Sequence, residues 1–228
     1  MGFSPVTDLL GRPDELRAFI KEVLARRERR TIPAGSLREA AVLVPLCWRD
    51  PGPAVLLTKR SLDVEHHKGE ISFPGGRFEP GDRDIVHTAL REAHEEIGLA
   101  GDDVDVLGLL DDHVSIVGYH ITPVVGSIPY PYPFRINSES EALIELELAR
   151  ILDGDAWMAE RSFFKGSSVN MFYLETDQGV VWGATARMLK HFADLLAGTT
   201  VPWGEVSASA RTWVMNLIQA QGAYRDLR

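Results

Sequence analysis

The chain has 228 residues, a formal net charge of −9, 45% hydrophobic residues and 25% charged residues. This composition is typical of a globular protein, and its acidic balance argues against a general nucleic-acid-binding protein, which would carry a basic surface. No stretch reaches the roughly 18 apolar residues of a membrane span, and the first residues lack the pattern of a secretory signal. The single cysteine, Cys47, excludes an internal disulfide. We therefore expect a cytoplasmic protein without nucleic-acid or membrane partners.

The N-terminal part predicts a helix over residues 14–30. Apolar residues recur there at helical spacing, and Pro13 and Asp14 are typical start signals. The basic run RRERR at its end is more typical of a solvated face than of a binding patch. Two apolar runs, residues 40–48 and 54–58, are then separated by the turn-rich sequence RDPGP, which predicts a β-hairpin.

Residues 59–81 hold several glycines and prolines without a clear period, and a long segment of this kind is often functional. A strongly patterned helix follows at residues 84–97. The remainder predicts strands at residues 104–110, 120–128, 143–148, 171–175 and 180–182, and helices at 184–196 and 206–221. Strands mixed with a few helices indicate an α/β sandwich rather than a regular βαβ array.

The helix at residues 84–97 contains the sequence REAHEE, which gathers three carboxylates. At about 100° per residue, Glu95 and Glu96 lie roughly 60° and 40° to either side of Glu92, so all three project from one face. Apolar residues form a separate stripe that should pack on a sheet, and Gly98 should end the helix. Clustered like charges weaken a helix slightly, which makes sense if a hard divalent cation binds between them. A merely solvated acidic face is the alternative.

A glycine-rich loop, FPGGRFEPGD, leads into this helix. Gly75 and Gly76 permit backbone conformations closed to other residues and let the chain approach a ligand closely. The helix N-terminus that follows also favours anions. No GK[ST] sequence is present, so this is not an ATP-type phosphate loop. The loop and the acidic helix together predict a site for a metal ion and a pyrophosphate.

The segment that runs from Gly76 through Asp82 to Leu99 resembles the Nudix box, G-x5-E-x7-R-E-U-x-E-E-x-G-U, where U is aliphatic. The second half, from Arg91 onward, matches well. In the first half Asp82 replaces the glutamate, and the spacing to Arg91 is one residue longer. This longer spacing is a feature of the coenzyme A pyrophosphatase branch of the Nudix hydrolases.

Further segments are similar to the same branch. LLTKRS (residues 56–61) and GEISFPGG (residues 69–76) resemble the motif L-L-T-x-R-[SA]-x3-R-x3-G-x3-F-P-G-G. Glu65 stands where this motif has its second arginine. Shorter similar stretches lie at residues 114–119, 122–126 and 181–186.

The resemblance implies a Nudix-type α/β/α sandwich around a mixed β-sheet, with extra N- and C-terminal helices. The Nudix domain would span residues 40–198. Residues 1–39 would form a helical extension, and residues 199–228 a helical tail packing on the domain or on a partner subunit. Apolar surface for such a homodimer is offered by Trp203, Trp213, Val214 and Leu217.

The resemblance also implies roles for individual residues. Mg²⁺ or Mn²⁺ would be bound by Glu92, Glu95, Glu96 and the Gly75 carbonyl, with Asp82 as an outer ligand. Catalytic roles would fall to Arg91, which orients the carboxylates, and to Glu92 and Glu95, with Glu95 or another box carboxylate as general base. Substrate contacts would come from Arg60, Lys59, Gly76 and Tyr119.

The implied reaction is hydrolysis of the diphosphate of coenzyme A or acyl-coenzyme A, which gives 3′-phosphoadenosine 5′-phosphate and (acyl-)4′-phosphopantetheine. Three alternatives remain at this point. Glu65 favours a Nudix enzyme for another small-molecule substrate, such as ADP-ribose, a dinucleotide or a nucleotide. A catalytically silent nucleotide-binding Nudix domain would usually have lost metal-binding carboxylates. The blandest alternative is an α/β domain whose likeness to the box is coincidental.

Overall fold

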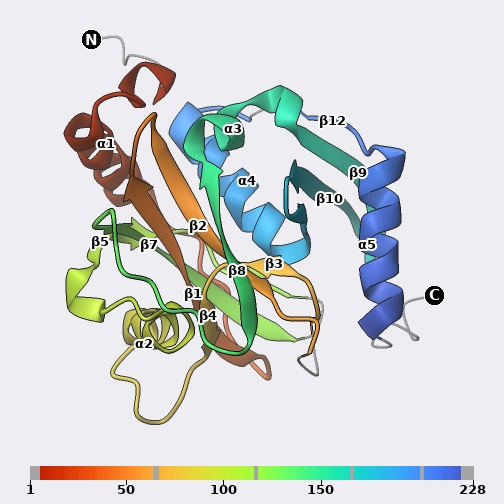
Figure 1. Cartoon of the computed structure of the whole chain (residues 1–228), viewed down its shortest axis with the longest axis horizontal. Helices are drawn as coiled ribbons and strands as arrows, with labels where there is room; N and C mark the ends of the chain where they lie inside the picture. The colour runs from red at the N-terminus through yellow and green to blue at the C-terminus, as the bar shows by residue number, and fades with distance from the viewer. Residues whose placement is uncertain (1–5, 64–66, 116–117, 165–166, 201–202, 222–228) are drawn as a thin grey trace.

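The computed structural model describes residues 6–63, 67–115, 118–164, 167–200 and 203–221. They form two β-sheets and the helices that cover them (Figure 1). The α-helices are α1 (Pro13–Arg26), α2 (Ile85–Ile97), α3 (Leu148–Leu152), α4 (Gly183–Ala197) and α5 (Ala208–Gln221). Short 3₁₀ turns cover Val6–Leu9, Gly101–Asp103 and Gly154–Ala156. None of the helices in these ranges has the length and apolar character needed to cross a membrane.

The larger sheet is mixed. Its eight described strands are β1 (Arg38–Trp48), β2 (Pro53–Arg60), β3 (Ile71–Ser72), β4 (Gly75–Arg77), β5 (Asp105–Leu109), β6 (His113–Val114), β7 (Tyr119–Ile128) and β8 (Ser140–Glu147). β1 runs parallel to β7 and antiparallel to β2 and β4, while β2 also pairs with β3 and β8. The expected hairpin of β1 and β2 is confirmed by the pairing of Leu46 with Val55.

Helices cover both faces of this sheet. On one face the apolar stripe of α2 packs against alternate residues of the central strands; the cluster includes Ala89, Ala93, Ile97, Leu43 and Leu56. On the other face the core is built from α1, α3 and α4. β1 and β2 are therefore buried on both sides, which explains their nearly continuous apolar sequences. This is the expected sandwich.

The N-terminal helix is part of the main core, because Leu16 and Ile20 are fully buried on α1. The helix ends at Arg26, earlier than expected, and only part of the basic run is solvated: Arg26, Glu28 and Arg30 are exposed. Arg27 forms an ion pair with Asp111, and Arg29 forms one with Asp112. The expectation of a solvated face therefore holds for only part of the run, because Arg27 and Arg29 pair with carboxylates from a loop some 80 residues away, which a local pattern does not show.

The C-terminal half adds a second sheet that the sequence did not predict as a unit. Its strands are β9 (Trp157–Phe164), β10 (Ser167–Thr176), β11 (Gly179–Trp182) and β12 (Gly204–Glu205), in the order β11-β10-β9-β12. Helix α5 lies beside this sheet, at the opposite end of the molecule from α1 (Figure 1). Val214 of α5 is buried against Tyr173 and Val180. The side chains of Trp213 and Leu217 lie outside the described residues.

Candidate active site

Helix α2 has the ends that its sequence predicts. The Asp84 carboxylate accepts a hydrogen bond from the His87 N–H (2.8 Å) at the N-terminus. At the C-terminus Gly98 adopts a left-handed conformation (φ 71°), and its N–H bonds back to the last turn. Glu96 therefore lies in the final turn of a helix that is fixed at both ends.

Asp82 is held by a bidentate interaction with Arg91. Arg91 Nε donates to one Asp82 oxygen at 2.9 Å and Nη2 donates to the other at 3.1 Å. Thr88, His87 and the Glu79 N–H also bond to this carboxylate, whose side chain is 1% exposed. The Arg91 guanidinium holds the pKa of Asp82 well below its usual range. Protein donors thus occupy the acceptor positions of Asp82 in this arrangement. Its expected role as an outer metal ligand stays a prediction.

Glu92 packs directly against the glycine loop. A methyl group added to Gly76 would overlap the Glu92 carboxylate, at 2.6 Å from Oε2. The side chain of Glu92 is largely buried, and Arg91 Nη1 lies 3.0 Å from Oε1. Burial raises the pKa of Glu92 against the opposing effect of Arg91, and the charges of Glu95 and Glu79 raise it further. Gly76 is therefore required because its missing side chain leaves room for this carboxylate.

Glu96 is the most buried of the three glutamates, with 9% of the residue exposed. Burial raises its pKa to about 7; the charges of Glu92 and Glu139 add to this effect, while Arg60 and the Gly75 N–H oppose it. Within the described ranges no basic side chain forms an ion pair with Glu96. Its negative charge is thus buried with little compensation.

Glu95 differs from its two neighbours. Its side chain is 54% exposed, and its carboxylate lies 3.2 Å from Arg91 Nη1. Arg91 therefore contacts Asp82, Glu92 and Glu95 at once and links the start of the box to its acidic turn.

In the arrangement seen, no three acidic, histidine or cysteine side chains of the described segments converge closely enough to hold a metal ion. In this arrangement Arg91 pairs with Glu92 and Glu95, and the expected binding of a cation by Glu92, Glu95 and Glu96 stays a prediction. The donor set still fits a hard divalent cation. Glu92 and Glu96 are neighbours on α2 whose ionised forms are disfavoured by burial, which a cation would relieve. Mg²⁺ is usually bound through only one or two protein carboxylates, with water and substrate phosphates completing its shell.

The two segments that flank Glu65 form one antiparallel hairpin. Thr58 pairs with Ser72, and the Arg60 N–H donates to the Glu70 carbonyl at 2.9 Å. This pairing places Arg60 close enough to Glu96 to lower its pKa. Glu65 itself lies outside the described residues.

The two basic residues at the end of β2 have different partners. Arg60 Nη2 lies 3.1 Å from Glu139, and Lys59 Nζ lies 2.7 Å from Glu141. Of the two, Arg60 is the one whose charge acts on Glu96. Arg60 therefore lies near the acidic turn of α2, whereas Lys59 forms its ion pair with Glu141 of β8.

Tyr119 is connected to the box through Arg77. Arg77 Nε donates to the Tyr119 hydroxyl at 2.7 Å, and the guanidinium of Arg38 lies 4.1 Å from the ring centroid. The Arg77 carbonyl in turn accepts a hydrogen bond from Arg91 at 2.9 Å. Tyr119 thus lies among arginines beside the glycine loop.

Glu139 is a residue that sequence reasoning missed. It lies 79 positions from Arg60, in an irregular segment before β8, and no local pattern marks it. Its relation to the site comes only from the pairing of β2 with β8, which is a tertiary feature.

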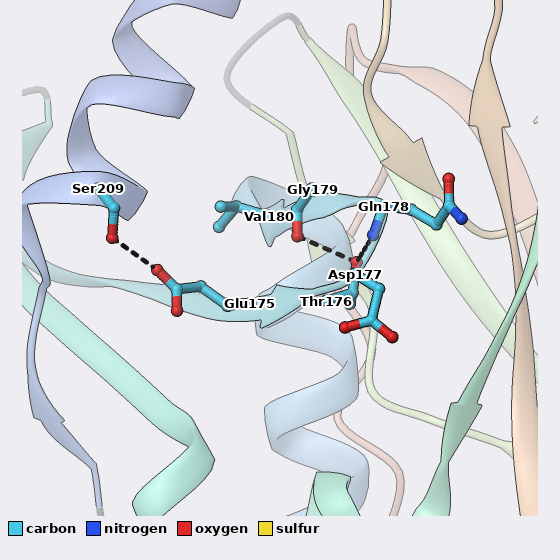
Figure 2. A pocket seen from close by; sticks show the side chains of 7 residues that line it. All are labelled: Glu175, Thr176, Asp177, Gln178, Gly179, Val180 and Ser209. Carbon is cyan, nitrogen blue, oxygen red and sulfur yellow. Dashed lines mark hydrogen bonds between the residues drawn. The ribbon is translucent and has the colours of Figure 1, made fainter.

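A surface hollow elsewhere on the molecule does not involve these residues. Figure 2 shows it at the turn between β10 and β11, next to the start of α5. It is lined by Glu175, Thr176, Asp177, Gln178, Gly179, Val180 and Ser209. With two carboxylates and no basic side chain in this lining, it is a poor site for a pyrophosphate.

Comparisons with known proteins point to one family. The NUDIX domain family matches residues 37–163. A protein from Escherichia coli (strain SMS-3-5) described as "Uncharacterized Nudix hydrolase NudL" is 38% identical over 157 residues, which cover 68% of this chain and 81% of that protein. A protein of the same description from Shigella boydii serotype 18 matches to the same extent.

Solved structures have lower sequence identity to the chain. A MutT/nudix family protein from Enterococcus faecalis is 13% identical with a TM-score of 0.45, covering 86% of this chain and 74% of that one. The Nudix hydrolase RenU from M. smegmatis is 26% identical with a TM-score of 0.42, covering 48% and 70% of the two chains.

Proposed function

The chain belongs to the Nudix hydrolase family, and on this premise we propose that it hydrolyses the diphosphate of coenzyme A or an acyl-coenzyme A. The family assignment makes it a hydrolase of phosphoric anhydride bonds in nucleoside diphosphate derivatives. Residues of β2, β3 and the glycine loop support coenzyme A as the substrate.

One observation carries this choice. The segments LLTKRS and GEISFPGG, which resemble the coenzyme A motif, are joined by the pairing of β2 with β3, and Arg60 at the end of β2 lowers the pKa of the buried Glu96. A guanidinium beside a carboxylate pair suits a substrate diphosphate, because the arginine neutralises charge that the metal ion does not. Arg60 is therefore the main candidate for contact with the diphosphate.

Different residues of the site would bind the metal ion, position the carboxylates and accept the proton of the attacking water. Glu92 and Glu96 would hold Mg²⁺ or Mn²⁺, which when bound acts as a Lewis acid toward phosphate oxygens and water. Gly76 leaves room for Glu92, and Arg91 sets the positions of the carboxylates. Glu95, exposed at the edge of the site, would take the proton of the attacking water and return it to solvent.

The overall step is balanced by water alone. The water oxygen forms a bond to one phosphorus, the bridging P–O bond breaks, and the second phosphate leaves with the bonding electrons. Coenzyme A and water thus give 3′-phosphoadenosine 5′-phosphate and 4′-phosphopantetheine.

Hydrolysis of coenzyme A in ¹⁸O-labelled water, with products identified by mass spectrometry, tests this proposal. We expect these two products, with the label in only one of them, which identifies the phosphorus attacked. A failure to cleave coenzyme A, or cleavage at the 3′-phosphate ester, would overturn the assignment.

A second candidate substrate class is favoured by Glu65, because an acidic residue at the position of a motif arginine removes one phosphate contact. ADP-ribose, a dinucleoside polyphosphate and a nucleoside triphosphate should therefore be assayed beside coenzyme A under the same metal conditions. A kcat/KM for one of them well above that for coenzyme A would favour this second class.

A further inference from the structure

Residues 135–139, here called the strap, connect the last turn of α2 to the end of β2. The N–H of Asn137 donates to the Glu96 carbonyl at 3.0 Å, and its side-chain amide donates to the Glu95 carbonyl at 3.3 Å. Carbonyl groups at a helix C-terminus have no partner within the helix and need such donors. The strap is thus fixed to the turn that carries the two acidic residues.

The strap's other end holds β2. The Glu139 carbonyl accepts a hydrogen bond from the Ser61 N–H at 2.8 Å, and its carboxylate accepts one from Arg60 Nη2 at 3.1 Å. The Glu139 N–H donates to the Asn137 side-chain oxygen at 2.9 Å, which joins the two ends of the strap that contact α2 and β2. The Arg60 guanidinium is therefore held at a defined place relative to α2.

Two carboxylates compete for this guanidinium. Glu139 is paired with Arg60 and its side chain is 55% exposed, whereas Glu96 is buried and lies in the helical turn to which Asn137 of the strap is bonded. The Coulomb attraction between two charges is stronger at a buried position than at an exposed one. Without Glu139, Arg60 would move onto Glu96 and occupy oxygens that a cation needs.

We propose that Glu139 is a positioning residue that holds Arg60 at the rim of the site and so keeps the Glu96 carboxylate available to a divalent cation. This inference rests on the proposed function, in which Glu96 binds the metal ion. It adds that the metal affinity of the box depends on a carboxylate outside the box, acting through Arg60.

Binding of Mn²⁺ to the full chain, followed by electron paramagnetic resonance, tests the proposal without relying on turnover. We expect Glu139→Ala to weaken Mn²⁺ binding by about tenfold. Glu139→Gln should lie between this variant and the wild type, because its amide oxygen still accepts a hydrogen bond from Arg60. Arg60→Ala should bind Mn²⁺ at least as tightly as the wild type.

The double variant Arg60→Ala/Glu139→Ala separates positioning from simple loss of charge. If Glu139 acts through Arg60, the double variant binds Mn²⁺ like Arg60→Ala, since the competing guanidinium is gone. Glu141→Ala is the matched control: this carboxylate also pairs with a basic residue of β2, and its loss should leave Mn²⁺ binding unchanged. Thermal unfolding of each variant checks that the fold is kept.

Two results would overturn the inference: unchanged Mn²⁺ binding by Glu139→Ala, or a double variant as impaired relative to Arg60→Ala as the single variant is to the wild type. Wild-type protein that binds no Mn²⁺ would contradict both this inference and the proposed function. Normal Mn²⁺ binding without cleavage of coenzyme A would contradict only the proposed substrate.

Discussion

Arg91 donates two hydrogen bonds to Asp82, of 2.9 and 3.1 Å, one to each oxygen of the carboxylate. The pair joins the loop before α2 to the middle of the helix and leaves Arg91 Nη1 for Glu92 and Glu95. Because bidentate pairs between arginine and carboxylate fix both distance and orientation, the acidic face of α2 is aligned by a residue that lies outside the helix.

Replacement of Asp82 by Asn should lower the free energy of unfolding by about 3 kcal/mol, because it removes the buried, bidentate partner charge of Arg91 and leaves only the contacts of Nη1 with Glu92 and Glu95. Chemical denaturation at pH 7 measures this difference. A variant as stable as the wild type would show that the pair does not support the fold.

The same pair predicts a pH dependence. The pKa of Asp82 is lower in the folded state than in the unfolded state, so its stabilisation is present above the unfolded pKa of about 4 and is lost as the pH falls below it. Denaturation curves between pH 5 and 2 should show this loss in the wild type and a smaller one in Asp82→Asn. Equal pH dependence of the two proteins would contradict this origin of the stability.

The two loop glycines should differ when each is changed to alanine. At Gly76 the atoms nearest to the new methyl group are the carboxylate of the Glu92 side chain, which can move away, so we expect a folded protein with activity reduced by about 100-fold or more. At Gly75 the methyl group meets the backbone of Ala41 and Val42, which cannot move, so we expect a loss of stability. Thermal unfolding and kcat/KM, measured on both variants, separate the two effects; a fully active Gly76→Ala would contradict the placement of Glu92.

How much of this site the sequence predicts depends on the range of the interactions. The ends of helix α2 were predicted to within one residue because its apolar stripe, the Asp84 cap and Gly98 are local features of the sequence. The helical projection also predicted that Glu92 and Glu96 lie on the same face of α2. It did not show that Arg91 pairs with Glu92 and Glu95, since side-chain pairing is not determined by the position of a residue around the helix.

Features that depend on distant segments were not predictable. Glu139 reaches Arg60, and Asp112 reaches Arg29, only through the pairing of strands and the packing of loops. The second sheet was predicted only in part, because β9 pairs with β10 along a sequence, WMAERSFF, without regular alternation of apolar and polar residues.

The two basic residues at the end of β2, Lys59 and Arg60, should differ in their effect on substrate binding. Arg60→Ala should raise the KM for the pyrophosphate substrate by about tenfold, because a charge-assisted contact to phosphate is lost. Lys59→Ala should have little effect, since Lys59 is paired with Glu141 and Arg60 is the basic residue among the main influences on the pKa of Glu96. Steady-state kinetics on both variants decide this, and a larger effect for Lys59 would reverse the assignment of the phosphate contact.

Burial raises the pKa of Glu96 to about 7. The folded state without metal therefore binds a proton more tightly than the unfolded state, so stability falls as the pH rises from about 4.5 to about 7. Glu96→Gln removes this cost and should make the metal-free protein more stable at pH 8, by up to about 3 kcal/mol. The same change should reduce activity by orders of magnitude because a carboxylate of the cation site is lost.

Thermal unfolding of the wild type and Glu96→Gln at pH 8, with EDTA or with Mn²⁺, is the most direct test of the cation site. The wild type should have the lower Tm in EDTA and gain clearly from Mn²⁺, because the ion compensates the buried charge. Glu96→Gln should start from a higher Tm and gain little. An equal gain from Mn²⁺ in both proteins, or a Glu96→Gln that is less stable in EDTA, would contradict the assignment of Glu96 as a metal-binding residue.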